Sequence, residues 1–417
     1  MSPNSSPPSV LILLVGSNPL PNYLIAAALR PSHLVLVYTA ETKTAKQRLE
    51  ECLQQSLGVA TLHEKFIADA TDAAEVYQTI ETTIREWQKE REIQIHLNYT
   101  GGTKVMSVHA RTAFKDAGGR KEHASYLEDG GPGASPRLRF DDGSSTDLSE
   151  LCIPPLTLET ILALHGARLQ IGKPYEPAPT DGDADKIARA AFKSPPLPQR
   201  LHQALDQLFG QEKNPARFFE KPLRPGDYGL ELSVEALPME GHVAALRNKH
   251  DKESWFRHWC KFLGGGWLED WVAQCIQRTG LLTDPGRQLR KGFQVFRSGG
   301  QAQLEIDVAV TRNYRSYFLS CTTSSDKGLC KSKLFEIAVR AKQLAGDLAR
   351  PALVCLAGGN TLNALRAEVD DEPSRTIALR VPGVADVHLF GLEDLRAWAG
   401  WQDAPPNLSS LKNWLES

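Results

Sequence analysis

Short apolar runs alternate with helical patterns through roughly the first 120 residues, and this alternation constrains the fold more than any other feature. The runs lie within residues 9–19, 33–42 and 93–100, and each is followed by a helical pattern or a turn that leads into one. A continuous apolar run is typical of a strand that is covered on both faces, as in a parallel sheet. The alternation therefore predicts an α/β fold with a Rossmann-like, doubly wound parallel sheet at the N-terminus.

Two of the predicted strands end in polar turns that contain glycine. In open α/β sheets, ligands bind outside the carboxyl ends of the strands. Adjacent glycines let the backbone approach a ligand, and the N-terminus of the following helix attracts an anion. The spacing fits neither a P-loop nor a G-x-G-x-x-G fingerprint, and a turn that merely caps a helix is the alternative. The residues that we predict to bind a ligand here are Gly16, Ser17, Asn18, Asn98, Thr100, Gly101, Gly102, Thr103 and Lys104.

The second turn carries a specific resemblance. Its sequence, N-Y-T-G-G-T-K-x-M, runs from Asn98 to Met106 and resembles the signature of CARF domains, the CRISPR-associated Rossmann-like sensors of cyclic oligoadenylates. The resemblance covers about residues 8–150 and implies a homodimer that binds one ring across its two-fold axis. Such an axis favours a ring with an even number of units, which implies cyclic tetra-adenylate as the activator. The earlier turn at Gly16 resembles the other wall of the family's pocket.

A second group of polar residues lies far along the chain. Glu269 lies on a predicted helix that follows a run of glycines, and Asp307 lies on a β-like run, with Glu305 two residues earlier on the same face. Carboxylates in such positions can hold Mg²⁺ or Mn²⁺ beside a scissile phosphate. The alternative is that each is an ordinary carboxylate on a solvated surface. We predict that Glu269 and Asp307 are metal ligands and catalytic residues.

The order of elements in residues 263–358 resembles PD-(D/E)XK restriction-endonuclease-like folds, which are fused to CARF domains in CRISPR ancillary nucleases. The resemblance implies a Glu-x-Lys triplet at the end of the second strand. This chain has Ser320-Cys321-Thr322 there, so both expected residues are missing. Either the domain is catalytically inactive, or a lysine at another position supplies the charge.

Three lysines follow this strand, at the start of a predicted helix whose N-terminal end is already positive. Such a local conflict is expected at functional sites more than elsewhere. Lys331 precedes Leu334 and Phe335 by three and four positions, which places it near the buried face of the helix. We therefore predict Lys331 as the catalytic replacement, Lys333 as the second choice and Lys327 as the third.

The composition narrows the class of protein. The net charge is −2, so no global positive field indicates nucleic-acid binding, and a local groove is expected from Arg287, Arg290, Lys291 and Arg297. Seven scattered cysteines without a C-x-x-C pair argue against a zinc site or a disulfide framework and fit a cytoplasmic protein. Neither a signal peptide nor a membrane-spanning segment is expected.

These features predict three parts: a CARF-like sensor in residues 1–150, a connecting and largely helical region in 151–262, and a nuclease-like α/β domain in 263–417. A linker is expected at 174–185. The leading hypothesis is a type III CRISPR effector, a metal-dependent endonuclease that cleaves DNA or RNA when cyclic tetra-adenylate is bound. One alternative is a catalytically degenerate sensor that binds nucleic acid or a partner protein. The other is a ring nuclease that cleaves the cyclic oligoadenylate itself.

Overall fold

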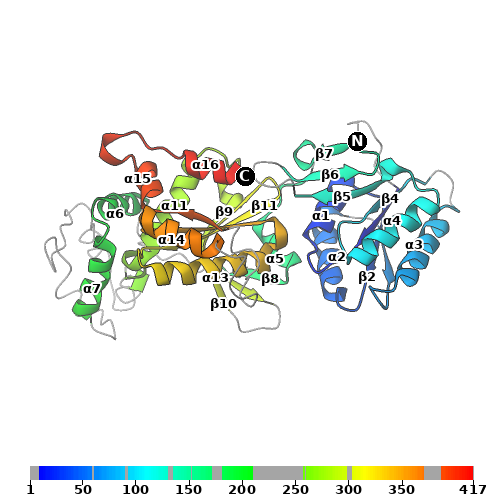
Figure 1. Ribbon diagram of the computed structural model, residues 1–417, viewed down its shortest axis with the longest axis horizontal. Coiled ribbons are helices and arrows are strands. Elements are labelled where there is room, and N and C mark those ends of the chain that lie inside the picture. The colour runs from blue at the N-terminus through cyan, green and yellow to red at the C-terminus, as the bar shows by residue number, and fades with distance from the viewer. Residues whose placement is uncertain are drawn as a thin grey trace.

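Two lobes, each built around one sheet, lie side by side in the computed structural model of the protein (Figure 1). The structure describes residues 9–58, 61–89, 93–129, 135–151, 153–170, 181–209, 257–258, 260–297, 303–370 and 387–416. The chain is a mixed α/β protein with a largely parallel N-terminal sheet and a second sheet, as the sequence predicts. No helix within the described ranges is long and apolar enough to cross a membrane.

The first sheet has seven strands in the order β3-β2-β1-β4-β5-β6-β7. The five strands from β3 to β5 are parallel, and β6 and β7 extend that edge as an antiparallel hairpin. This hairpin matches the turns or hairpin expected from the Gly- and Asp-rich sequence of residues 129–145. The strands are β1 (Val10–Leu14), β2 (His33–Tyr38), β3 (Thr61–Phe66), β4 (Ile95–Asn98), β5 (Ala124–Glu128), β6 (Arg137–Phe140) and β7 (Ser145–Asp147).

Helices cover both faces of this sheet. They are α1 (Leu20–Leu29), α2 (Lys43–Leu57), α3 (Ala73–Trp87) and α4 (Lys104–Asp116). Alternate residues of β1 enter different apolar layers: Leu11 and Leu13 pack with α1 and α2, whereas Ile12 and Leu14 pack with α3 and α4. This burial on both faces explains why β1 is a continuous apolar run in the sequence. The edge strand β3 is only partly buried and has no such run, so the sequence pattern did not predict it.

The second sheet has six strands in the order β13-β12-β11-β10-β9-β8. They are β8 (Ala167–Gln170), β9 (Leu289–Arg297), β10 (Gln303–Arg312), β11 (Arg315–Thr322), β12 (Ala349–Cys355) and β13 (His388–Phe390). β10 and β11 form an antiparallel hairpin around Asn313 and Tyr314. Their positive φ angles of 49° and 65° suit a two-residue type I′ turn. The expected turn at Arg312 and Asn313 is one residue away from this position.

The connecting region contributes to this second sheet. β8 lies within residues 151–262 and pairs with β9, so the sheet includes a strand from outside the range 263–417. Of the expected linker, residues 174–180 lie outside the described residues, and 181–185 are the start of helix α6 (Asp181–Lys193) rather than an irregular segment. The helices of this lobe are α5 (Leu158–Leu164), α6, α7 (Leu197–Phe209), α11 (Trp267–Arg278), α12 (Pro285–Gln288), α13 (Lys327–Ala345), α14 (Gly359–Asp370), α15 (Leu392–Ala399) and α16 (Ser409–Glu416).

α11 and α13 cover opposite faces of the second sheet. Trp267 and Trp271 of α11 are completely buried in one apolar cluster, and the buried face of α13 belongs to the other. The two tryptophans are therefore core residues and not a platform for stacking bases.

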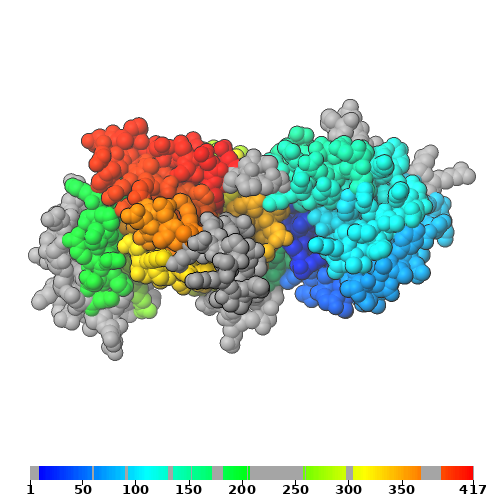
Figure 2. All heavy atoms as spheres, in the orientation of Figure 1, coloured from blue at the N-terminus to red at the C-terminus, as the bar shows by residue number. Residues whose placement is uncertain are grey.

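Ion pairs and a shared apolar cluster join the two lobes. Asp129, which follows β5, binds Arg315 at 3.1 Å and Arg350 at 2.8 Å in the second lobe. One continuous apolar cluster includes Leu11 of the first sheet and Phe318 of the second. The space-filling view shows the amber spheres of the second lobe directly against the blue spheres of the first (Figure 2). The first sheet is therefore in direct contact with the second lobe near the end of β5.

Candidate functional site

The two glycine turns meet where the strand order of the first sheet reverses. β2 and β3 lie on one side of β1 and β4 lies on the other, with Leu13 of β1 opposite Asn98 of β4. A ligand site is expected at such a switch point. The turns are in close contact, because a Cβ atom on Gly16 would lie 3.0 Å from the amide nitrogen of Gly102. The structure thus brings the two predicted groups together.

Glycine is needed at both positions of the Gly-Gly pair. A Cβ atom on Gly101 would overlap the carbonyl oxygen of Leu14. Gly102 has a φ of 76°, in the left-handed region that favours glycine, and its α-carbon faces the side chain of Met106. The pair therefore lets the turn after β4 lie flat against the end of β1.

Several predicted ligand-binding side chains shape this turn. Buried Asn98 donates from Nδ2 to Ser125 Oγ at 3.1 Å and accepts from the Thr100 amide at 3.2 Å. Thr100 Oγ1 accepts from the Leu127 amide at 2.7 Å. Thr103 caps α4, because its Oγ1 accepts from the Met106 amide at 3.1 Å. These bonds fix the turn and reduce the capacity of the three side chains to bind a ligand directly.

The remaining predicted residues have different environments. Lys104 is the first residue of α4 and is exposed, and Ser17 on the other turn is also exposed. Asn18 instead faces the second lobe: its Oδ1 lies 3.2 Å from His165 Nε2, after α5. A Cβ atom on Gly346, directly after α13, would overlap the Asn18 side chain. The first turn thus forms a contact between lobes that the sequence pattern did not indicate.

The predicted carboxylates come together in the second lobe. Glu269 is in the first turn of α11, and Asp307 is in the middle of β10. Burial and the neighbouring charge of Asp307 raise the pKa of Glu269 to about 8. Burial also raises the pKa of Asp307, although Lys333 and the hydrogen bonds to Asp307 act in the opposite direction. Two half-buried carboxylates that repel each other in this way are unlike solvated surface groups.

The pairing of β10 with β9 is interrupted at Asp307, between two paired residues. Ile306 pairs with Phe293 and belongs to the apolar cluster of α13, whereas Val308 pairs with Lys291 and belongs to the cluster of α11. The regular alternation of β10 side chains between the two faces of the sheet is therefore interrupted at Asp307. Gly292 stands opposite this point, with a φ of 54°, and a Cβ atom there would lie 3.7 Å from Glu269 Oε2.

The residues that replace Glu-x-Lys bind Asp307 instead. The Cys321 amide donates to Asp307 Oδ2 at 2.6 Å, and Ser320 Oγ donates to the same oxygen at 3.3 Å. Thr322 ends β11. This strand end positions one carboxylate but supplies no cation.

The predicted lysines lie in the first two turns of α13, which begins at Lys327. The Asp326 carboxylate caps the helix by accepting from the Leu329 amide at 2.8 Å, and this negative charge offsets the conflict with the helix dipole. Lys331 is half-buried. Lys333 pairs with Glu336 at 3.3 Å, and its charge acts on Asp307. Lys333 is therefore linked electrostatically to one of the two carboxylates.

A fourth lysine, which the sequence pattern did not indicate, contacts a carboxylate next to this pair. Lys261 directly precedes a π-helical turn, Phe262–Gly266, and its Nζ atom lies 2.8 Å from Glu305 Oε1. The hydrogen bond to Glu305 raises the pKa of Lys261, and the charges of Glu269 and Asp307 add to the effect. The only hint in the sequence was that Lys261 lies three residues before the glycine run. No sequence pattern indicates that this position contacts β10.

The sequence of residues 10–127 matches the family model of the Card1 CARF domain, and this range contains both glycine turns. This part of the chain is a CARF domain. Among curated proteins no match is found.

The whole chain also shares its fold with solved structures. Can2 from Sulfobacillus thermosulfidooxidans, in complex with cyclic tetra-adenylate, is 15% identical with a TM-score of 0.62, over 98% of this chain and 97% of that one. Protein VC1899 from Vibrio cholerae is 16% identical with a TM-score of 0.62, over 93% and 95%. A type III CRISPR defence DNA nuclease activated by cyclic oligoadenylate is 19% identical with a TM-score of 0.51, over 85% of this chain and 46% of that one. The shared fold therefore extends from the CARF domain through the second lobe.

The donor set in the lobe beside the CARF domain fits a hard divalent cation. Glu269 and Asp307 offer carboxylate oxygens, which Mg²⁺ and Mn²⁺ prefer, and a cation between them would offset the burial and the charge of Asp307 that raise the pKa of Glu269. Among the described residues, no cluster of three or more His, Cys, Asp or Glu could hold a metal ion. Two carboxylates suffice for Mg²⁺, which usually retains several waters and binds substrate phosphates.

The cations expected to form a groove are mostly paired. Arg287 lies 3.5 Å from Asp284, Arg290 3.1 Å from Glu159, and Lys291 2.8 Å from Asp270. The side chain of Arg297 lies outside the described residues.

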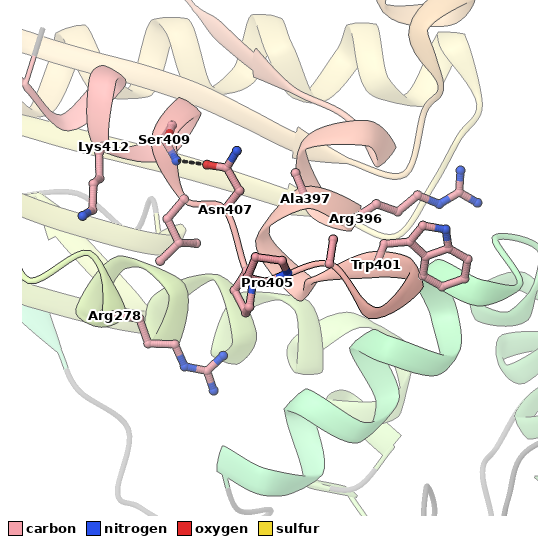
Figure 3. Close-up of a pocket in the computed structure, with 11 residues that line it drawn as sticks. Arg278, Arg396, Ala397, Trp401, Pro405, Asn407, Ser409 and Lys412 are labelled. Carbon is pink, nitrogen blue, oxygen red and sulfur yellow. Dashed lines mark hydrogen bonds between the residues drawn. The ribbon is translucent and has the colours of Figure 1, made fainter.

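A different hollow carries more available positive charge. Its volume is about 730 Å³, and its lining includes Arg278, Arg396, Trp401 and Lys412 but no carboxylate among the described residues (Figure 3). In the part of the chain that the structure describes, Lys412 has no ion-pair partner, whereas Arg278 contacts Asp185 at 3.4 Å. Arg278 ends α11 and Glu269 is in its first turn, so about 14 Å along the helix axis separates the hollow from the carboxylates.

Proposed function

We propose that the protein is a type III CRISPR effector: a metal-dependent endonuclease that a cyclic oligoadenylate activates. The observation that carries this proposal is the half-buried, mutually repelling pair of Glu269 and Asp307 in a lobe that adjoins a CARF domain. Two proteins of similar fold support the choice of ligand: Can2 was solved in complex with cyclic tetra-adenylate, and the DNA nuclease is activated by a cyclic oligoadenylate. We infer the same ligand class for this chain.

The CARF domain would bind cyclic tetra-adenylate at the two glycine turns. A symmetric homodimer would present two copies of each turn to a ring of matching symmetry. The Gly101-Gly102 backbone would approach the ring closely, and exposed Lys104 at the start of α4 would contact its phosphates. Binding activates only if the ring prefers the active arrangement of the second lobe.

The second lobe would be a PD-(D/E)XK-like nuclease domain that cleaves phosphodiester bonds of DNA or RNA. Glu269 and Asp307 would hold Mg²⁺ or Mn²⁺, which polarises a phosphate and lowers the pKa of an attacking water. The Cys321 amide and Ser320 hydroxyl keep Asp307 oriented. A nearby cation would stabilise the negative charge that develops on the phosphate, and the sequence alone predicts Lys331 or Lys333 for this role.

Substrate would also contact the basic hollow. Lys412 and Arg396 offer positive charge without a competing carboxylate in the lining, and a polynucleotide is long enough to span the distance along α11. The protein would act in the cytoplasm, where type III CRISPR targets and reduced cysteines are both found.

The test is a cleavage assay on plasmid DNA, single-stranded DNA and single-stranded RNA in Mn²⁺ or Mg²⁺. We expect cleavage only when cyclic tetra-adenylate is present, and we expect EDTA to abolish it. No cleavage of any substrate would overturn the nuclease proposal. Loss of the ring itself without EDTA sensitivity would instead indicate a ring nuclease in the CARF domain.

One observation favours a second candidate, a sensor without catalytic activity. Ser320 and Thr322 occupy the places of the expected glutamate and lysine. In that case, the protein would bind the ring and nucleic acid but would cleave neither of them with any divalent metal ion tested.

A further inference from the structure

The proposed nuclease site needs a cation that β11 does not supply. Lys333 lies on one side of the carboxylates, but Glu336 binds it at 3.3 Å, and Arg340 binds the same Glu336. Lys333 is therefore part of a network within α13. The opposite side of the site is formed by the segment that leads into α11.

That segment lies against the end of β11. Gly265 has a non-helical backbone, and a Cβ atom there would lie 3.9 Å from Thr323 Cγ2, one residue after the strand. A Cβ atom on Gly264 would have no heavy atom within 4 Å, so space remains beside the turn. The glycine run, which begins three residues after Lys261, therefore passes close to the end of β11, where the lysine of Glu-x-Lys is expected.

We propose that Lys261 is the catalytic cation of this site and that it contacts the scissile phosphate. This inference rests on the proposed nuclease function and identifies the residue that replaces the missing lysine. Lys261 binds Glu305 at 2.8 Å, and Glu305 is two residues from Asp307 on β10. The lysine side chain is 63% exposed, so a phosphate can reach it without any rearrangement of the core.

The charge environment keeps Lys261 protonated. Its hydrogen bond to Glu305 raises its pKa, and the charges of Glu269 and Asp307 act in the same direction. A flexible four-carbon stem lets the ammonium group leave Glu305 and follow a phosphate during the reaction. Because the pair with Glu305 is partly exposed, separating it costs little free energy.

An ordinary surface ion pair is the competing explanation, and a matched lysine tests it. Lys342 pairs with Asp347 at 3.4 Å and is also about half exposed. It lies in the last turn of α13, whereas Lys333, whose charge acts on Asp307, lies near the start of that helix. The variants Lys261→Gln, Lys261→Arg and Lys342→Gln would be compared in ring-activated cleavage with Mn²⁺. We expect kcat to fall about 100-fold in K261Q, to recover partly in K261R and to remain unchanged in K342Q.

A second measurement separates this inference from the nuclease proposal. In an Asp307→Asn background, binding of a fluorescent single-stranded oligonucleotide would be measured by anisotropy with and without K261Q, and thermal melting would confirm folding. We expect K261Q to weaken binding several-fold. If wild-type protein cleaves and K261Q cleaves equally well, or if K261Q changes neither cleavage nor oligonucleotide affinity, the assignment of Lys261 is wrong. If wild-type protein cleaves nothing but K261Q still weakens binding, the phosphate contact stands and the nuclease proposal fails.

Discussion

Asn18 and His165 lie within hydrogen-bond distance, 3.2 Å, across the junction between the CARF domain and the second lobe. The same asparagine packs against Gly346, at the C-terminal end of α13. The 19-residue helix is about 28 Å long and carries Lys331 and Lys333 near its other end. One rigid helix thus connects a predicted ligand turn with the carboxylate site.

Replacing His165 with phenylalanine should weaken activation more than ring binding. The change removes the polar contact with Asn18 but leaves the Gly101-Gly102 turn intact, so coupling between the sites should fall by about 1–3 kcal/mol. The measurements are the ratio of cleavage rates with and without cyclic tetra-adenylate, expected to fall about 5- to 150-fold, and the Kd of the ring by calorimetry. His202→Phe, at an exposed position of α7, is the control. An unchanged activation ratio in H165F would show that this contact does not transmit the signal.

The parallel core of the fold was predictable because β1 and β2 are buried on both faces and therefore appear as apolar runs, and because β4 places Ile95 and Leu97 directly before the glycine turn. The relation between Gly16 and Gly102 was predictable too, since the carboxyl ends of adjacent parallel strands meet. Lys261 was not predictable, because its approach to Glu305 depends on a π-helical turn and a tertiary contact. Nor was the role of Asn18 at the junction, because no local pattern indicates a contact with a residue 147 positions away.

Gly101→Ala should prevent the two glycine turns from closing. The added methyl group would overlap the carbonyl oxygen of Leu14, and the buried strand ends cannot move easily. We expect a loss of about 2–4 kcal/mol in unfolding free energy and no measurable ring binding. Urea denaturation and calorimetry would check both effects. Gly359→Ala, at the start of α14 where no heavy atom lies within 4 Å, should change neither; an equal loss in both variants would argue against a specific contact.

Stability of the metal-free protein should fall as the pH rises from about 4.5 to 8. The pKa of Glu269 is raised from 4.5 to about 8, so the folded state binds this proton more tightly than the unfolded state does. Loss of the proton therefore destabilises the fold across this interval. Mn²⁺ should raise the Tm more at about pH 8.5 than at about pH 6, because only the ionised pair binds the cation well.

Glu269→Gln is the control for this pH dependence. The neutral amide cannot titrate, so the Tm of the variant should depend less on pH and respond less to Mn²⁺. An unchanged slope of Tm against pH in E269Q would show that Glu269 is not responsible.

Lys412→Glu should weaken nucleic-acid binding through the basic hollow. A single phosphate contact accounts for a change of about one in the slope of log affinity against log salt concentration. Fluorescence anisotropy in an Asp307→Asn background at several salt concentrations would measure that slope without cleavage. Lys115→Glu, on the exposed side of α4, introduces the same charge change in the CARF domain. Equal effects of the two variants would mean that only net charge matters.

The central claim is that a ring bound to the CARF domain permits cleavage at the carboxylate pair in the second lobe. The most direct measurement compares wild-type protein with Asp307→Asn, recording both the Kd of cyclic tetra-adenylate and the rate of nucleic-acid cleavage in Mn²⁺. We predict equal ring affinity in both proteins, ring-dependent cleavage by the wild type, and a rate at least about 1,000-fold lower in D307N. Cleavage by the wild type at the same rate without the ring, or undiminished cleavage by D307N, would contradict the account.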